Sequence, residues 1–106
     1  MPTPFERFSR SLTRDNLWVY ILTLLKEQDM YPYEIREKVR QKFGFLPGNV
    51  TAYMVLKKLE AGGYVRAVRR VKDHGPEKTY YEITEKGGKE IKNASRLYKE
   101  IGKKLF

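Results

Sequence analysis

One stretch of the chain, from Val50 to Thr84, constrains the fold more than any other. It runs VTAYMVLKKLEAGGYVRAVRRVKDHGPEKTYYEIT. Its first part has the apolar spacing of an amphipathic helix, which the double glycine at 62–63 ends. Two runs of β-branched and aromatic residues follow, and the polar residues 73–76 supply a turn between them. The stretch therefore predicts a helix followed directly by a basic two-stranded hairpin.

The predicted helix has two different faces. The residues that recur at i, i+3, i+4 and i+7, and that we expect to face the core, are Ala52, Val55, Leu56 and Leu59. The opposite face carries Val50, Tyr53, Met54 and Lys57, with Thr51 and Lys58 beside them. A face that mixes apolar, aromatic and basic side chains is typical of a surface that recognises a partner.

A helix followed by a basic hairpin is the arrangement of a winged helix-turn-helix. In that fold the helix enters the major groove of DNA, and the hairpin reaches the neighbouring backbone or the minor groove. The charge agrees with this interpretation, because the 106-residue chain has a net charge of +9. Residues 36–78 alone contain eleven basic and four acidic residues, a net charge of +7. Such a cluster favours a polyanionic partner, and a basic surface that only maintains solubility is the alternative.

The rest of the chain is predicted to be helical. Residues 5–12 suggest a short amphipathic helix, and residues 17–28 form a helix that is apolar on nearly all sides. Since so small a chain has little material to cover that second helix, we expect part of it to meet another subunit. Pro32 suits the first turn of a third helix, which Gly44 ends, and either Asp15 or Asn16 can cap the second.

The last predicted helix begins at Thr84 and runs toward Phe106. Its apolar residues, spaced 3, 4, 3 and 4 apart, are Ile91, Ala94, Tyr98, Ile101 and Leu105. This is the narrow seam of a heptad pattern, which packs against a partner helix. We therefore predict an α+β, mostly α, winged helix-turn-helix with a two-stranded wing over 1–84, including an N-terminal helical extension. Residues 85–106 are predicted to form a C-terminal dimerisation helix.

Four segments resemble a known family. YPYEI at 31–35 is similar to HGYEI, and TAYMVLKKLEAGGYV at 51–65 to TLYPALKRLEEEGLV. GPEKTYYEIT at 75–84 resembles a wing pattern ending in KYYRLT, and EKGGKEI at 85–91 resembles TEEGRKEL. From Leu17 onward the chain resembles the PadR-like transcriptional regulators, in particular the short members with one C-terminal helix. Pro32 stands where the family usually has Gly, and Met54 where it often has Pro.

The resemblance implies a homodimeric repressor that binds a palindromic operator through the winged helix. The residues that we predict to contact DNA are Asn49, Val50, Thr51, Tyr53, Met54, Lys57, Lys58, Arg69, Arg70, Lys72, His74 and Lys78. The predicted dimer interface contains Leu17, Trp18, Ile21, Ile91, Ala94, Tyr98, Ile101 and Leu105. Some family members bind flat aromatic compounds between these helices, so Trp18 and Tyr98 are also candidates for a small aromatic effector.

Several of these residues have a second interpretation. Asn49 is either a helix cap or a reader of adenine, and capping is the more common role. Tyr53 either contacts DNA or packs on the wing. Lys57 and Lys58 suit phosphates better than bases, because flexible point charges position a protein without specifying sequence. Trp18 is either a core or interface residue or part of the effector site.

The wing residues are constrained by strand geometry. Side chains alternate along a strand, so Arg69 and Arg70 should point to opposite sides, and some of the basic residues from Arg66 to Lys78 must face away from DNA. His74, the only histidine, is either a turn residue or a minor-groove contact, and it has no companions for a metal site.

The sequence disfavours several other classes. No cysteine is present, so disulfides and thiolate metal sites are excluded, and nothing suggests an enzyme or a cofactor. No apolar run is long enough to cross a membrane or to form a signal peptide, so we expect a cytoplasmic protein. The alternatives that remain are an architectural DNA-binding protein, an RNA-binding winged helix and a winged helix that binds proteins.

Overall fold

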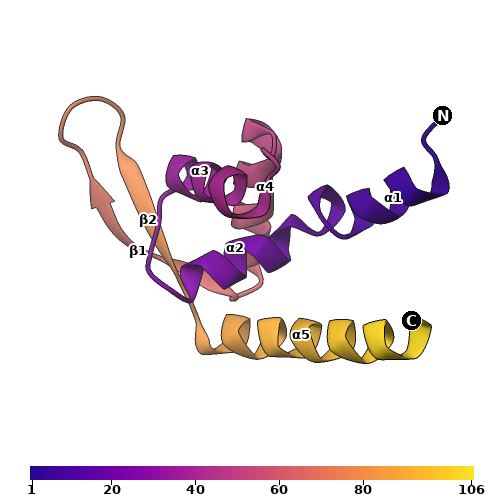
Figure 1. Cartoon of the computed structure of the whole chain (residues 1–106). Coiled ribbons are helices and arrows are strands. Elements are labelled where there is room, and N and C mark those ends of the chain that lie inside the picture. The colour runs from indigo at the N-terminus through magenta and orange to yellow at the C-terminus, as the bar shows by residue number, and fades with distance from the viewer.

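The order of helices and strands follows the expected winged helix in a computed structural model that describes residues 1–106. The helical elements before the hairpin are α1 (Pro4–Ser11), the 3-10 turn η1 (Arg14–Asn16), α2 (Leu17–Leu25), α3 (Pro32–Phe43) and α4 (Asn49–Ala61). The hairpin consists of β1 (Val65–Val71) and β2 (Lys78–Ile83), and α5 (Glu85–Leu105) follows. Helices α2, α3 and α4 form the body, the hairpin projects from one side, and α1 and α5 extend toward the other (Figure 1).

The core is made of apolar side chains from α2, α3, α4, the hairpin, the start of α5 and the segments before and after α3. Its largest fully buried side chains are Ile21, Leu22, Leu24, Met30, Ile35 and Leu56. No polar or charged side chain is among the buried residues, so burial of apolar surface is the main stabilising contribution. No helix is both long and apolar enough to span a bilayer.

Helix α2 is covered by its own chain to a greater extent than we expected. Leu17 and Ile21, which we predicted at a dimer interface, are only 2% and 0% exposed and lie within the core of their own chain. The reason is the central position of α2, which contacts α3, α4, α5 and β2. A second subunit is therefore not needed to cover these two side chains, and they are not available to one. The same holds for Ile91 of α5, also predicted at the interface, which is 7% exposed and packs in the same core.

The helix ends were mostly predicted correctly. Pro32 begins α3, and Gly44 ends it with a φ of 82°. The Thr84 hydroxyl caps α5 by accepting a hydrogen bond from the Gly87 amide at 3.2 Å. The prediction that Asn49 caps α4 is wrong, because Gly48 takes the cap position and Asn49 is the first helical residue. Its exposed side chain makes no capping hydrogen bond.

A short backbone bridge joins β2 of the hairpin to the body. The backbone of Tyr81 exchanges two hydrogen bonds with that of Met30, in the segment before α3, at 2.9 and 3.1 Å. Both side chains are buried in the core. Between Ala67 and Arg69 the strand register shifts, as in a β-bulge, and beyond it Arg69 lies opposite Tyr80. The strand pairing in the outer part of the wing is therefore offset from the pairing at its base.

The start of α5 approaches the base of the hairpin very closely at Gly87. A Cβ atom on this residue would lie 2.2 Å from the Tyr64 carbonyl oxygen and 2.8 Å from Ile83 Cγ1. One turn of α5 can pack here only because Gly87 has no side chain. The neighbouring Gly88 has no atom within 4 Å of the equivalent position.

This contrast gives a test of the packing. Gly87→Ala should lower the free energy of unfolding by roughly 1–3 kcal/mol, because the added methyl group forces the backbone apart. Gly88→Ala should instead raise it by up to about 1 kcal/mol, since alanine favours the helix. Urea denaturation of both variants measures the difference. Equal stability of the two would contradict the close approach.

Candidate nucleic-acid interface

The two faces of α4 are those that the sequence predicts. Val50, Tyr53 and Met54 are 69%, 52% and 53% exposed, whereas Ala52 and Leu56 are buried. Lys57 and Lys58 are exposed as well. The outer face of α4 therefore offers apolar, aromatic and basic groups to whatever the protein binds.

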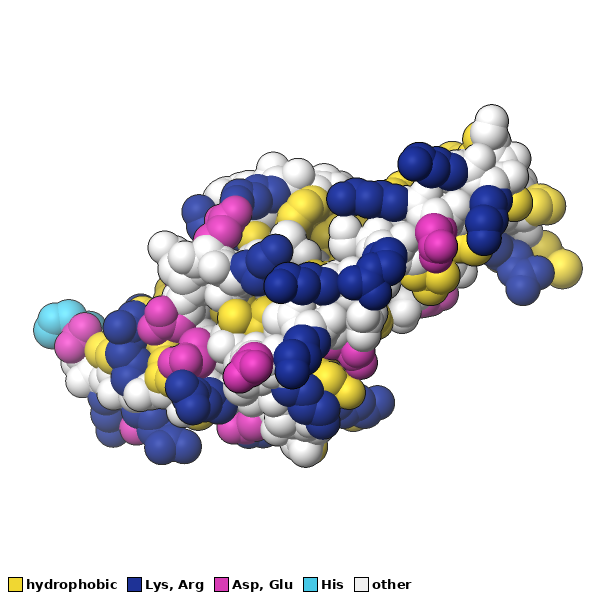
Figure 2. Space-filling model, turned by 90° about the horizontal axis from the view of Figure 1, so that it is seen from below, with side chains coloured by type: hydrophobic (Ala, Val, Ile, Leu, Met, Phe, Trp, Pro, Cys, Tyr) yellow, Lys and Arg dark blue, Asp and Glu magenta, His cyan; other side chains and the backbone are white.

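This face borders a groove of about 610 Å³ that lies between α4, the start of α3 and the hairpin. Three of the predicted residues on α4 line it, namely Asn49, Tyr53 and Lys57, and the hairpin contributes Arg70 and Lys78. The structure thus brings these five candidates to one concave surface. The groove is not lined by the other predicted residues, which are Val50, Thr51, Met54, Lys58, Arg69, Lys72 and His74. His74 and Lys72 lie exposed at the tip of the wing, the end that the single histidine marks in Figure 2.

The groove also contains residues that sequence reasoning missed. Tyr31 and Tyr33, at the start of α3, line it and stack on each other with ring centres 6.5 Å apart. Tyr31 also meets Tyr80 of the wing edge to face, at 5.3 Å. The motif YPYEI at 31–35 contains both tyrosines, but its pattern indicated only where α3 begins.

Aromatic rings support two of the wing cations. The Arg69 guanidinium lies 4.0 Å from the centre of the Tyr80 ring, and the Lys78 ammonium 4.9 Å from that of Tyr31. Such cation–π contacts hold a flexible basic side chain over a ring face. Both cations are therefore partly ordered before any partner binds.

Arg69 and Arg70 point to opposite sides of β1, as expected. Arg69 turns toward Tyr80 and lies 3.6 Å from a carboxylate oxygen of Asp29. Arg70 lies on the groove side, 3.7 Å from Glu77. Of the two arginines, Arg70 is the one that shares the groove with α4.

Carboxylates of the same chain hold several of the cations. Lys57 is 2.7 Å from Glu60, and this hydrogen bond raises the pKa of the Lys57 ammonium group. Arg66 is 3.1 Å from Glu82 on the outer side of the hairpin. All these pairs are exposed to solvent, which screens them, so they contribute little to stability. A phosphate group can therefore replace the carboxylate at small cost. Nowhere do three or more His, Cys, Asp or Glu side chains come together as metal ligands would.

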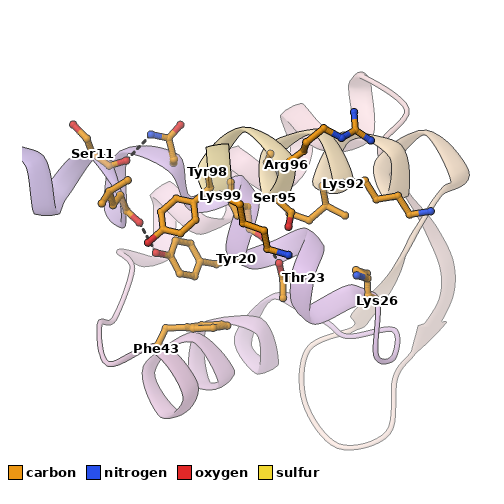
Figure 3. A pocket seen from close by; sticks show the side chains of 15 residues that line it. Ser11, Tyr20, Thr23, Lys26, Phe43, Lys92, Ser95, Arg96, Tyr98 and Lys99 are labelled. Carbon is orange, nitrogen blue, oxygen red and sulfur yellow. Dashed lines mark hydrogen bonds between the residues drawn. The ribbon is translucent and has the colours of Figure 1, made fainter. Parts of the chain in front are cut away.

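A second hollow, of about 900 Å³, lies between α2 and α5 (Figure 3). Tyr98 lines it, as predicted for an effector site, but Trp18 does not. Residues two apart on a helix point in nearly opposite directions, so Tyr20 occupies the hollow while Trp18 lies elsewhere on α2. The Trp18 indole N–H donates to Asn16 Oδ1 at 3.4 Å. This corrects the predicted pairing of Trp18 with Tyr98.

The floor of this hollow is aromatic and its rim is basic. The Tyr20 ring packs edge-on against Phe43 at 4.9 Å, and burial raises the pKa of its hydroxyl group. The hydroxyl donates a hydrogen bond to the Leu12 carbonyl. The cations that line the hollow are Lys26, Lys92, Arg96 and Lys99, and no acidic residue lines it.

Comparison with known proteins places this geometry in a family. The model of the transcriptional regulator PadR-like family matches residues 21–93. A PadR family transcription regulator from hypervirulent Clostridium difficile R20291 is 26% identical with a TM-score of 0.73, over 83% of this chain and 92% of that one. A transcriptional regulator from Clostridium thermocellum is 30% identical with a TM-score of 0.72, over 90% and 94%. No curated protein matches the chain.

A third solved structure is that of Bacillus subtilis PadR in complex with operator DNA. It is 26% identical to this chain with a TM-score of 0.66, over 73% of this chain and 45% of that one. The matched family residues, 21–93, include α3, α4, the hairpin and the start of α5. The match covers most of the sequence and every element that borders the groove, and the chain therefore belongs to the PadR-like family of transcriptional regulators.

Proposed function

We propose that this protein is a sequence-specific DNA-binding repressor that acts as a homodimer on a palindromic operator. The observation that carries the proposal is the shared groove, in which the exposed face of α4 and the basic wing meet. A helix and a two-stranded hairpin border this groove of the protein, and winged helices use these two elements to contact DNA. The solved complex of Bacillus subtilis PadR with operator DNA supports operator binding by this chain.

The residues of α4 divide into two roles in this proposal. Val50, Thr51 and Met54 are exposed on the outer face and supply methyl and thioether groups that suit the thymine methyl group in the major groove. Lys57 and Lys58 bind phosphates and fix the register of the helix on the duplex. Asn49 does not cap the helix, and its side chain reads adenine or binds the DNA backbone.

The hollow between α2 and α5 suits a small effector. Its aromatic floor, formed in part by Tyr20, Phe43 and Tyr98, accepts a planar ring, and the cations on its rim favour a ligand with an anionic group. Because α5 is also the proposed dimerisation helix, a ligand here would change how two copies pack. The effector is therefore proposed to control the affinity for the operator.

Selection of fragments from genomic DNA tests the proposed function. The protein should enrich a short motif with two-fold symmetry. Uniform retention of all fragments would indicate an architectural DNA-binding protein, and preferential binding of structured RNA an RNA-binding one. Failure to bind either would indicate a winged helix that binds proteins.

The two neighbouring arginines of the wing give the first prediction from this proposed function. Arg70→Ala should weaken operator binding by about 10-fold, because Arg70 lies in the groove beside α4. Arg69→Ala, the matched control on the opposite side of β1, should weaken it by less than about 3-fold. Fluorescence anisotropy at fixed salt measures both. Equal losses, or a larger loss for Arg69→Ala, would contradict the proposed orientation of the wing.

The second prediction concerns dimerisation through α5. Ile101 is exposed in the single chain and lies on the apolar seam, so Ile101→Asp places a charge in the proposed interface and leaves the core intact. Sedimentation should shift from dimer toward monomer, and operator affinity should fall by roughly 100-fold or more, since one half-site binds weakly. An unchanged dimer would show that the seam is not the interface.

A further inference from the structure

Lys78 differs from the other two cations that line the groove in how it is held. Lys57 and Arg70 each lie beside a carboxylate of the same chain, which partly offsets their charge. Lys78 forms no such ion pair, and its ammonium group lies 4.9 Å from the centre of the Tyr31 ring. An aromatic face, and not a carboxylate, therefore holds this cation in the groove.

The Tyr31 ring is itself held by the body of the protein. The preceding residue, Met30, forms the backbone bridge with Tyr81, and the connection from α2 to α3 runs beside β2 (Figure 1). The Tyr31 carbonyl accepts a hydrogen bond from the Ile35 amide of α3 at 3.0 Å. The ring contacts two further tyrosine rings, whose centres lie 6.5 and 5.3 Å away. Both the backbone of Tyr31 and its ring therefore have fixed positions beside the groove.

A lysine that rests on such a ring is still able to bind a phosphate. An ammonium group has three N–H donors, and contact with a ring face leaves part of the group open to a further partner. A free lysine side chain is long and flexible, so binding through it orders several rotatable bonds and lowers the affinity. A ring that already holds the ammonium group in the groove removes much of that cost.

We propose that Tyr31 is a positioning residue, which holds the Lys78 ammonium group in the groove for a phosphate of the DNA backbone. The proposal deepens the DNA-binding function proposed above and rests on it. Tyr31 acts through Lys78 and makes no contact with DNA that the role requires, because the ring face is what holds the cation. The family pattern HGYEI has a histidine at this position, so the tyrosine is a feature of this chain.

Nuclear magnetic resonance tests the contact in the absence of DNA. The ring current of Tyr31 should shift the ε-methylene proton signals of Lys78 upfield from those of the other lysines, and Lys78→Met identifies these signals by their loss. Tyr31→Leu should abolish the shift, whereas Tyr31→Phe, which keeps the ring, should preserve it. Lys78 signals at the ordinary lysine position in the wild-type protein would overturn the proposal.

A double-mutant cycle tests whether Tyr31 acts through Lys78. Tyr31→Leu should weaken binding to the duplex enriched from genomic DNA by about 3–10-fold, the cost of ordering one long side chain. In the Lys78→Met background the same change should weaken binding by less than about 2-fold, since no ammonium group remains to be positioned. A loss of equal size in both backgrounds would overturn the proposal, because Tyr31 would then act independently of Lys78.

Two further variants serve as controls. Tyr31→Phe should bind within about 2-fold of the wild-type protein, and a loss as large as that of Tyr31→Leu would assign the hydroxyl group to DNA and overturn the positioning role. Lys86→Met is the matched control for Lys78→Met, since Lys86 lies 4.6 Å from the centre of the Tyr64 ring, outside the groove. Lys78→Met should lower the salt slope by about 1, and Lys86→Met should leave it unchanged. Equal changes in slope would overturn the assignment of a phosphate to Lys78.

Failure of this proposal is distinguishable from failure of the proposed function. A wild-type protein that enriches no duplex would refute DNA binding and the positioning role together. A wild-type protein that binds its selected duplex, and whose affinity Tyr31→Leu leaves unchanged, would refute only the role of Tyr31.

Discussion

The short bridge between Met30 and Tyr81 determines how the wing and α4 face each other. Two backbone hydrogen bonds join these residues, and both side chains are buried in the core. A two-stranded hairpin alone is marginally stable in water, so its position depends on attachment to the body. This bridge and the core beneath it align Arg70 and Lys78 with Tyr53 across one groove.

The basic side chains of the groove are already held in positions that suit a polyanion. Lys57 and Arg70 are held by carboxylates of their own chain, and Lys78 is held over the ring of Tyr31. These exposed contacts are weak, so a phosphate oxygen competes with them easily, while the side chains stay near the groove in its absence. Binding through such contacts is expected to depend strongly on salt.

Local sequence patterns predicted most of the fold. The periodicity of α4, the glycines that end it and the cap at Thr84 are short-range features, and each is confirmed. The opposite orientations of Arg69 and Arg70 followed from strand alternation alone. These features depend on residues a few positions apart, so no tertiary information was needed.

Features that depend on long-range packing were not predicted. Leu17 and Ile21 are covered by elements that lie far away in the sequence, and hydrophobic periodicity does not reveal such contacts. Tyr31 reaches the groove only because Met30 pairs with a strand some fifty residues later. Tyr20 lines the hollow and Trp18 does not, because of how α2 is rotated about its own axis. The sequence of a helix that is apolar on all sides does not indicate that rotation.

The central claim is that the outer face of α4 reads DNA sequence, and comparing the preferred sites of two variants tests it most directly. Met54→Ala should change the preferred base at one position of each half-site, because Met54 is exposed in the middle of that face. Lys57→Ala should weaken binding to all sequences alike and lower the salt slope by about 1. Selection from a random-sequence library, followed by titration in salt, measures both. Uniform, sequence-blind losses for both variants would contradict recognition by α4.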